Sequence, residues 1–125
     1  MMEKTPGYHS HSRDVTPEKL ASVEGVAPRG EVEVRVMHVT DALLILEVKR
    51  KAGLVDPLHR HDDHESAGYL ISGRMRVIIG DEEFIAEPGT SWIHPVGVDH
   101  YSEALEDCVQ IEIKSPPRKT WEVRP

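Results

Sequence analysis

The chain has almost no cysteine, few aromatic residues and no long apolar segment. Its single cysteine, Cys108, excludes an internal disulfide and a cysteine-rich zinc cluster. No run approaches the roughly 18 consecutive apolar residues that a membrane-spanning helix needs. Residues 1–14 lack the apolar core of a secretory signal, so we expect none. These absences predict a cytoplasmic protein with no membrane partner.

An excess of positive charge is also missing. The sequence has 22 acidic and 15 basic residues, and its formal net charge is -7. Proteins that bind nucleic acid without sequence preference depend on lysine and arginine to neutralise phosphates, so we expect no nucleic-acid partner. A length of 125 residues suits one domain with one continuous core.

The beginning of the chain differs in composition from the rest. Residues 1–28 are polar and are interrupted by proline and glycine, which predicts an extended N-terminal arm. Within it, Thr16 followed by Pro17 has the pattern of a helix start, and we expect a short helical turn there. Residues 29–125 are predicted to form a single barrel domain.

From residue 31 onward the chain alternates between apolar and polar residues in short runs. This two-residue period is typical of half-buried strands. Gly80 and Asp81 separate two of the runs and suit a type II′ hairpin turn. Turn residues recur about every ten positions, and no amphipathic helix of useful length is present. The predicted fold is an antiparallel all-β sandwich or barrel, with strands at residues 31–36, 42–48, 74–79, 82–87 and 108–113.

The segment "PLHRHDDHESAGYLISG", residues 57–73, combines histidines and acids before turning apolar. If it continues a strand, His59 and His61 point to the same side because they are two positions apart. A later segment, "GTSWIHPVGVDH", supplies a third histidine, His100, directly after a rigid proline–glycine turn. Three convergent neutral imidazoles suit zinc, iron, manganese, nickel or copper.

These two segments resemble the two sequence motifs of the cupin superfamily. Gly53, His59, His61 and Gly73 match the first motif, and Gly89, Pro95, Gly97 and His100 match the second. The match fails at the end of the second motif, where the family often has asparagine and this chain has Ala104. The resemblance implies a small single-domain cupin, an antiparallel double-stranded β-helix or jelly-roll barrel. It also implies one divalent transition metal held by His59, His61 and His100.

The fourth ligand is where the chain departs from the family pattern. Counting forward from His61 places the usual glutamate at Glu65, whereas counting back from Gly73 places it at Ser66. Strand register favours Ser66 facing inward and Glu65 facing away. A bulge would restore Glu65 as a ligand, and we assign the site to His59, His61, Glu65 and His100. The alternatives are His64 approaching from the loop and completion of the site by water.

The same resemblance extends to small cupins that break down acidic sugars, through "HESAGYLISGRM" and "IKSPPR". It implies a metal-dependent isomerase, lyase or ring-opening enzyme that acts on a small sugar acid. The alternatives are an iron-dependent dioxygenase and a non-catalytic module that binds a small molecule. No catalytic residue is singled out, no organic cofactor is expected, and the exposed strand edges predict a homodimer.

Overall fold

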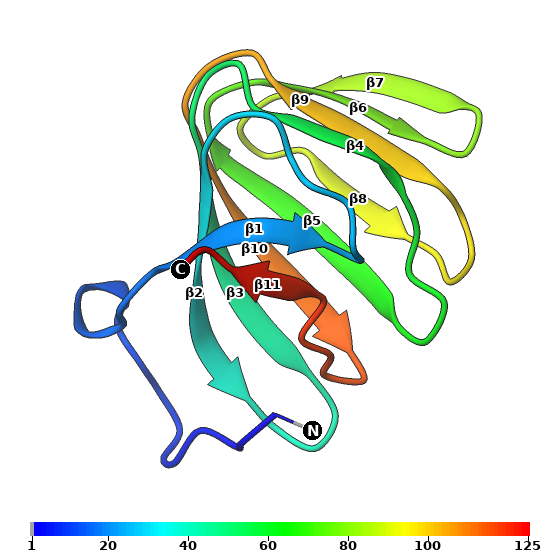
Figure 1. The fold of residues 1–125 in the computed structure, drawn as a ribbon. Helices are drawn as coiled ribbons and strands as arrows, with labels where there is room; N and C mark the ends of the chain where they lie inside the picture. The colour runs from blue at the N-terminus through cyan, green and yellow to red at the C-terminus, as the bar shows by residue number, and fades with distance from the viewer. Residues whose placement is uncertain (1) are drawn as a thin grey trace.

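The computed structural model describes residues 2–125 and shows two antiparallel sheets packed face to face (Figure 1). The larger sheet has, in spatial order, β11 (Trp121–Val123), β1 (Glu18–Val23), β2 (Val32–Val39), β3 (Leu44–Arg50), β10 (Cys108–Ser115), β5 (Glu65–Ser72) and β8 (Ser91–His94). The smaller sheet has the order β4 (Val55–His59), β9 (His100–Ala104), β6 (Met75–Ile79) and β7 (Glu82–Ala86). A single 3₁₀ turn, η1 (Ser12–Asp14), precedes them. The all-β jelly-roll prediction is confirmed.

The five strands predicted from alternation are all present, as β2, β3, β6, β7 and β10. The hairpin between β6 and β7 pairs Ile79 with Glu82, and Gly80 has the positive φ of 60° that the first residue of a type II′ turn requires. None of the helices among residues 2–125 is long and apolar enough to cross a membrane.

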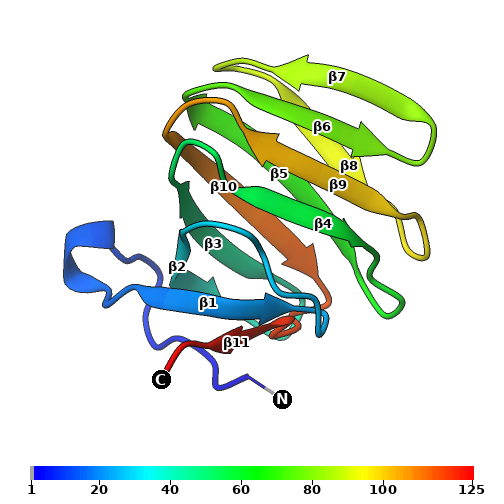
Figure 2. The ribbon, with the colours of Figure 1, turned by 45° about the horizontal axis from the view of Figure 1, so that its top comes forward.

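The helical turn expected from Thr16 is wrong. Strand β1 begins at Glu18 and pairs with both β2 and β11, while Leu20 is buried in the core. These inter-strand hydrogen bonds outweigh a local signal of one or two residues. Part of the segment that the sequence assigns to an N-terminal arm therefore lies in the larger sheet (Figure 2).

The core fills the space between the two sheets. Leu44, Leu46 and Val48 of β3 face Met75 and Val77 of β6, and none of the five side chains is more than 2% exposed. At about 25 cal/mol per Å² of apolar area, burial of each such side chain contributes roughly 1.5–3 kcal/mol. Near β4 and β9 the interior becomes polar, and this region contains the candidate site.

Candidate metal centre

Strand pairing brings two of the three histidines together. His59 is the last residue of β4 and His100 is the first of β9, and the two residues are direct partners in the antiparallel pair. His61 lies two residues past the end of β4, with its ring centroid 4.9 Å from that of His100. All three side chains are buried, and one nitrogen from each lies within 4.8 Å of the others. The sequence predicted this convergence, although His61 reaches the site from a loop rather than from the strand.

A hydrogen bond to the backbone determines which ring nitrogen of His59 carries the proton. Its Nδ1–H donates to the carbonyl of Pro57 at 2.8 Å, which leaves the lone pair on Nε2. This Nε2 lies 3.0 Å from Nε2 of His100. Two ligands of one ion with metal–nitrogen distances of about 2.1 Å are separated by about 3 Å when they are at right angles. The pair therefore has a separation that suits shared coordination.

Burial keeps the other two rings neutral. The pKa of His61 is lowered to about 2, mainly by burial and also by the nearby Lys114 and His100. Burial likewise lowers the pKa of His100 to about 4, assisted by His59. Neutral imidazole is the form that coordinates a metal. The buried Nδ1 atoms of His61 and His100 have no hydrogen-bond partner among the described residues. The donor set fits one divalent transition metal, and metal binding itself stays a prediction.

Glu65, the proposed fourth ligand, does not join the three histidines. It is exposed, and its neighbour Ser66 is buried because β5 pairs Ser66 with His94 and continues that register through Gly68. Side chains alternate along a strand, so no bulge is present to turn Glu65 inward. Ser66 Oγ instead shares a hydrogen bond of 3.0 Å with Nδ1 of His94.

His64 is the loop residue that approaches the site. It is 1% exposed, and its ring centroid lies 4.4 Å from that of His61. Its Nδ1–H donates to Asp63 at 2.8 Å, and its Nε2 accepts from Lys114 Nζ at 3.4 Å. Both nitrogens therefore have partners in the protein. Among residues 2–125 the convergent donors are His59, His61 and His100, and an ion held by these three would keep positions for water or substrate.

His94 supports the site without being one of the convergent donors. Its ring stacks on that of His100, with centroids 3.7 Å apart. Burial lowers its pKa well below the usual value, and His100 adds to the effect. His94 directly precedes Pro95, and nothing in the sequence pattern indicates that its ring stacks on His100.

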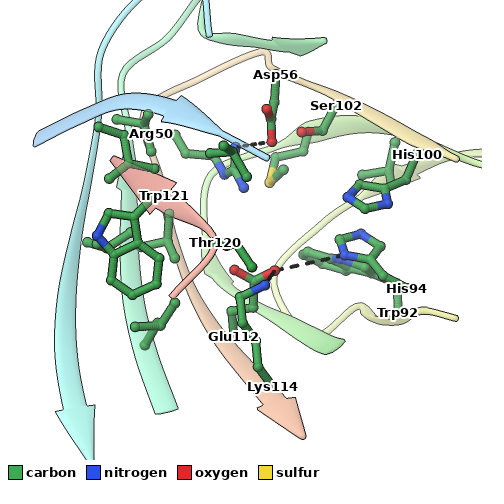
Figure 3. A pocket seen from close by; sticks show the side chains of 18 residues that line it. Arg50, Asp56, Trp92, His94, His100, Ser102, Glu112, Lys114, Thr120 and Trp121 are labelled. Carbon is green, nitrogen blue, oxygen red and sulfur yellow. Dashed lines mark ion pairs between the residues drawn. The ribbon is translucent and has the colours of Figure 1, made fainter. Parts of the chain in front are cut away.

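A cavity of about 40 Å³ lies inside the barrel, with His94 and His100 in its wall (Figure 3). Its wall carries four ionisable side chains in addition to histidines, and β1 and β11 close one side of it. The four are Arg50, Asp56, Glu112 and Lys114.

The pKa values of the two cavity carboxylates, Asp56 and Glu112, are shifted in opposite directions. Burial raises the pKa of Asp56, and Arg50, 3.8 Å away, only partly offsets this. Burial also acts to raise the pKa of Glu112, but Lys114 and Arg50 outweigh it and the net effect is a lowered pKa. Glu112 Oε1 lies 3.9 Å from Lys114 Nζ and 3.9 Å from His94 Nδ1. The cavity thus contains a carboxylate that is ionised at neutral pH and lies close to the histidines.

Strand β10 carries the polar side of this cavity. Glu112 and Lys114 line the cavity and Gln110 on the same face is buried, whereas Ile113 on the opposite face is 39% exposed. Gln110 and Glu112 alternate with apolar residues along this strand, so the sequence pattern alone would predict that they face solvent, and the structure shows the reverse. Lys114, which the sequence analysis missed, is 2% exposed. A lysine two positions from Glu112 on the same face was the available signal.

Comparisons with known proteins agree with this geometry. The family model described as "Cupin domain" matches residues 46–112. Oxalate decarboxylase OxdC of Bacillus subtilis is 37% identical over 82 residues, which are 62% of this chain and 21% of that protein. The chain therefore spans about a fifth of OxdC. The pectin degradation protein KdgF of Dickeya dadantii is 26% identical over 88 residues, covering 70% of this chain and 80% of that protein.

Solved structures give the same result. KdgF from a Halomonas species is 29% identical with a TM-score of 0.68, covering 70% of this chain and 81% of the other. An RmlC-like cupin from Shewanella frigidimarina is 19% identical with a TM-score of 0.81, covering 94% and 97% of the two chains. At that identity the second likeness shows the fold alone.

Proposed function

Because the chain belongs to the cupin family, we propose that it is a metal-dependent enzyme that acts on a small organic acid. The observation that supports this most directly is a group of three buried histidines, one of which, His100, lines a cavity whose wall also holds two cations and two carboxylates. An inert module needs no such set of ionisable groups away from water, because burying each charge is costly.

Each group has a role in this proposal. His59, His61 and His100 hold the metal, which when bound polarises a carbonyl or hydroxyl oxygen of the substrate as a Lewis acid. Arg50 and Lys114 attract the substrate carboxylate, since they are the cations of the cavity wall. Glu112 is ionised at neutral pH because Lys114 and Arg50 lower its pKa. It accepts a proton from the substrate and returns it to a neighbouring atom.

The substrate class that we favour is a sugar acid, with ring opening or isomerisation as the reaction. Two KdgF proteins resemble the chain over at least 70% of its length. Both changes move a proton between neighbouring atoms and require no oxidant, which agrees with a site that offers a base beside a Lewis acid.

A second candidate is decarboxylation of a small dicarboxylic acid. The cavity of about 40 Å³ favours a compact substrate, and the oxalate decarboxylase OxdC is 37% identical to this chain over 82 residues. We rank it second because the match covers only 21% of OxdC.

The experiment begins with metal analysis of the purified protein by inductively coupled plasma mass spectrometry. Protein loaded with each metal is then incubated with unsaturated uronates and, separately, with oxalate, and the products are followed by NMR and by carbon dioxide release. Glu112→Gln should abolish turnover while metal content is kept, and Glu122→Gln, a matched change at an exposed glutamate of β11, should leave turnover unchanged. Absence of turnover in every metal form, with retained binding of the acids, would instead assign the chain to the non-catalytic class.

The remaining expectations stay predictions. A cytoplasmic location, the absence of nucleic-acid and membrane partners, and a homodimer have no test in the structure. For the dimer, one relevant feature is that Tyr69, Ile71 and Ile93 are about half exposed on β5 and β8. Light scattering after size exclusion would decide the oligomeric state.

A further inference from the structure

The turn between β1 and the following segment has a residue that does not suit its conformation. Val23 and Val26 exchange two backbone hydrogen bonds of 2.9 Å, which makes Glu24 and Gly25 a two-residue turn. Both central residues have positive φ, 51° at Glu24 and 75° at Gly25. Type I′ turns have this pattern and strongly prefer asparagine, aspartate or glycine at the first position. Glu24 is the one non-glycine residue with positive φ among residues 2–125.

This strained position places a carboxylate beside the metal centre. Oε2 of Glu24 lies 3.9 Å from Nδ1 of His61, and the Glu24 side chain is 30% exposed. The backbone N–H of Glu24 donates to the carbonyl of Thr120 at 2.7 Å, which fixes the turn against the segment leading into β11. Backbone strain of this kind persists where the surrounding structure enforces it and is concentrated at functional sites.

His61 is the ring that needs such a partner. Its Nδ1 is buried and has no hydrogen bond within the described residues. A neutral imidazole that offers Nε2 to an ion carries its proton on Nδ1, and that N–H needs an acceptor. For His59 the carbonyl of Pro57 has this role. For His61 the carboxylate beside this nitrogen is that of Glu24, whose Oε2 is 3.9 Å away.

We propose that Glu24 is a positioning residue of the metal centre, accepting the Nδ1–H of His61 and so fixing the orientation of that ring. This inference rests on the proposed metal site. Carboxylates in this role orient the ligand and increase its basicity, and their removal typically lowers metal affinity 10–100-fold. Glu24 lies far outside both histidine segments in the sequence, and its turn connects the site to β1.

Two substitutions separate this role from an ordinary structural one. Glu24→Asn removes the carboxylate but supplies the residue that a type I′ turn prefers, so the metal-free protein should melt a few degrees higher. Glu24→Gln keeps the side-chain length and the strain, and it retains a weaker, uncharged acceptor. The control is Glu122→Gln, which removes an exposed carboxylate on neighbouring β11.

The measurements are calorimetric titration of Zn²⁺ and Co²⁺ into chelator-treated protein, the absorption spectrum of the Co²⁺ form, and the melting temperature without metal. We expect Glu24→Asn to melt higher than the wild type and yet bind metal at least 10-fold more weakly. Glu24→Gln should have a smaller loss of affinity at an unchanged melting temperature. Both variants should alter the Co²⁺ spectrum, and Glu122→Gln should match the wild type throughout.

Equal metal affinities in the wild type and both Glu24 variants would overturn the inference alone. So would a loss of affinity that parallels a loss of stability in the metal-free protein, since that is the signature of a structural role. A wild-type protein that takes up neither ion would overturn the metal centre itself, and the role of Glu24 with it.

Discussion

The imidazole ring of His94 lies flat on that of His100, with centroids 3.7 Å apart and ring planes 4° apart. The same His100 ring has its Nε2 3.0 Å from Nε2 of His59. One ring from β8 thus restrains a candidate ligand at the start of β9.

We expect His94→Ala to weaken metal binding about 10-fold and to lower stability by about 2–3 kcal/mol. The substitution removes a buried ring, leaves Ser66 Oγ without its partner and frees His100 to rotate. Metal titration and urea unfolding measure the two effects. His9→Ala, a change at an exposed histidine of the N-terminal segment, is the control and should alter neither. An unchanged metal affinity in His94→Ala would show that the stack does not restrain His100.

Alanine substitution of a convergent histidine and of Glu65 should affect metal content differently. His59→Ala or His100→Ala deletes a convergent donor, and we expect stoichiometric metal to be lost from the purified protein. Glu65→Ala changes an exposed side chain on the outer face of β5, and metal content should equal that of the wild type. Metal analysis after dialysis distinguishes these outcomes. Loss of metal in Glu65→Ala would mean that the strand register around Ser66 differs from the one described.

Gly68 should tolerate no side chain. A Cβ atom built there would lie 2.3 Å from Cε2 of Trp92, whose ring is buried. Overpacking of this severity displaces the ring, and we expect Gly68→Ala to cost about 3 kcal/mol and to change Trp92 fluorescence. Gly53→Ala is the comparison, because its φ is 90° but no atom lies within 4 Å of the added carbon. It should cost about 1 kcal/mol from backbone strain and leave the fluorescence unaltered. Equal costs would indicate that the Trp92 ring moves aside freely.

The buried pair Glu112 and Lys114 should be coupled. Lys114→Met takes from Glu112 the cation that contributes most to lowering its pKa, and the expected cost is about 3–5 kcal/mol at pH 7. Adding Glu112→Gln should recover much of that loss, so a double-mutant cycle should give a coupling energy of about 1–3 kcal/mol.

The interaction between Glu112 and Lys114 also determines how the free energy of unfolding depends on pH. The pKa of Glu112 is lowered in the folded protein, so its stabilising contribution is present above the unfolded value and is lost as pH falls through the folded one. Without Lys114, burial becomes dominant and raises the pKa, and protonation then favours the folded state. The stability deficit of Lys114→Met should therefore shrink between pH 7 and pH 5 in denaturant titrations. A constant deficit would contradict this assignment of the charges.

The sequence predicted five of the eleven strands found among residues 2–125, because alternation is a local pattern, and the resemblance carried by the two motifs predicted the jelly-roll fold and the convergence of three histidines. The prediction of which strand face is buried failed where the interior is polar. On β10 the apolar residues Val109, Ile111 and Ile113 lie on the outer face, and Gln110 and Glu112 face inward. In most strands the apolar face packs against the core. Here the charged side chains line an internal cavity, so the polar face of β10 lies inside.

Two further features depend on contacts between distant segments. Counting forward from His61 and back from Gly73 placed the fourth ligand at positions that differ by one residue, in the loop before β5. The pairing of Ser66 with His94 shows that Ser66 faces inward and Glu65 outward. Glu24 had no motif to identify it, since its proximity to His61 arises only when β1 pairs with β2 and β11. Neither contact can be inferred from spacing along the chain.

The register of β4 and β9 has a consequence for mechanical coupling within the barrel. β4 is an edge strand, and its ladder with β9 is irregular between Asp56 and His59, so few backbone bonds hold its end in place. An ion shared by His59 and His100 would act as a cross-link at the point where this ladder is weakest. Amide protons of β4 should then exchange more slowly in loaded protein, which would make the edge of the smaller sheet a reporter of metal occupancy.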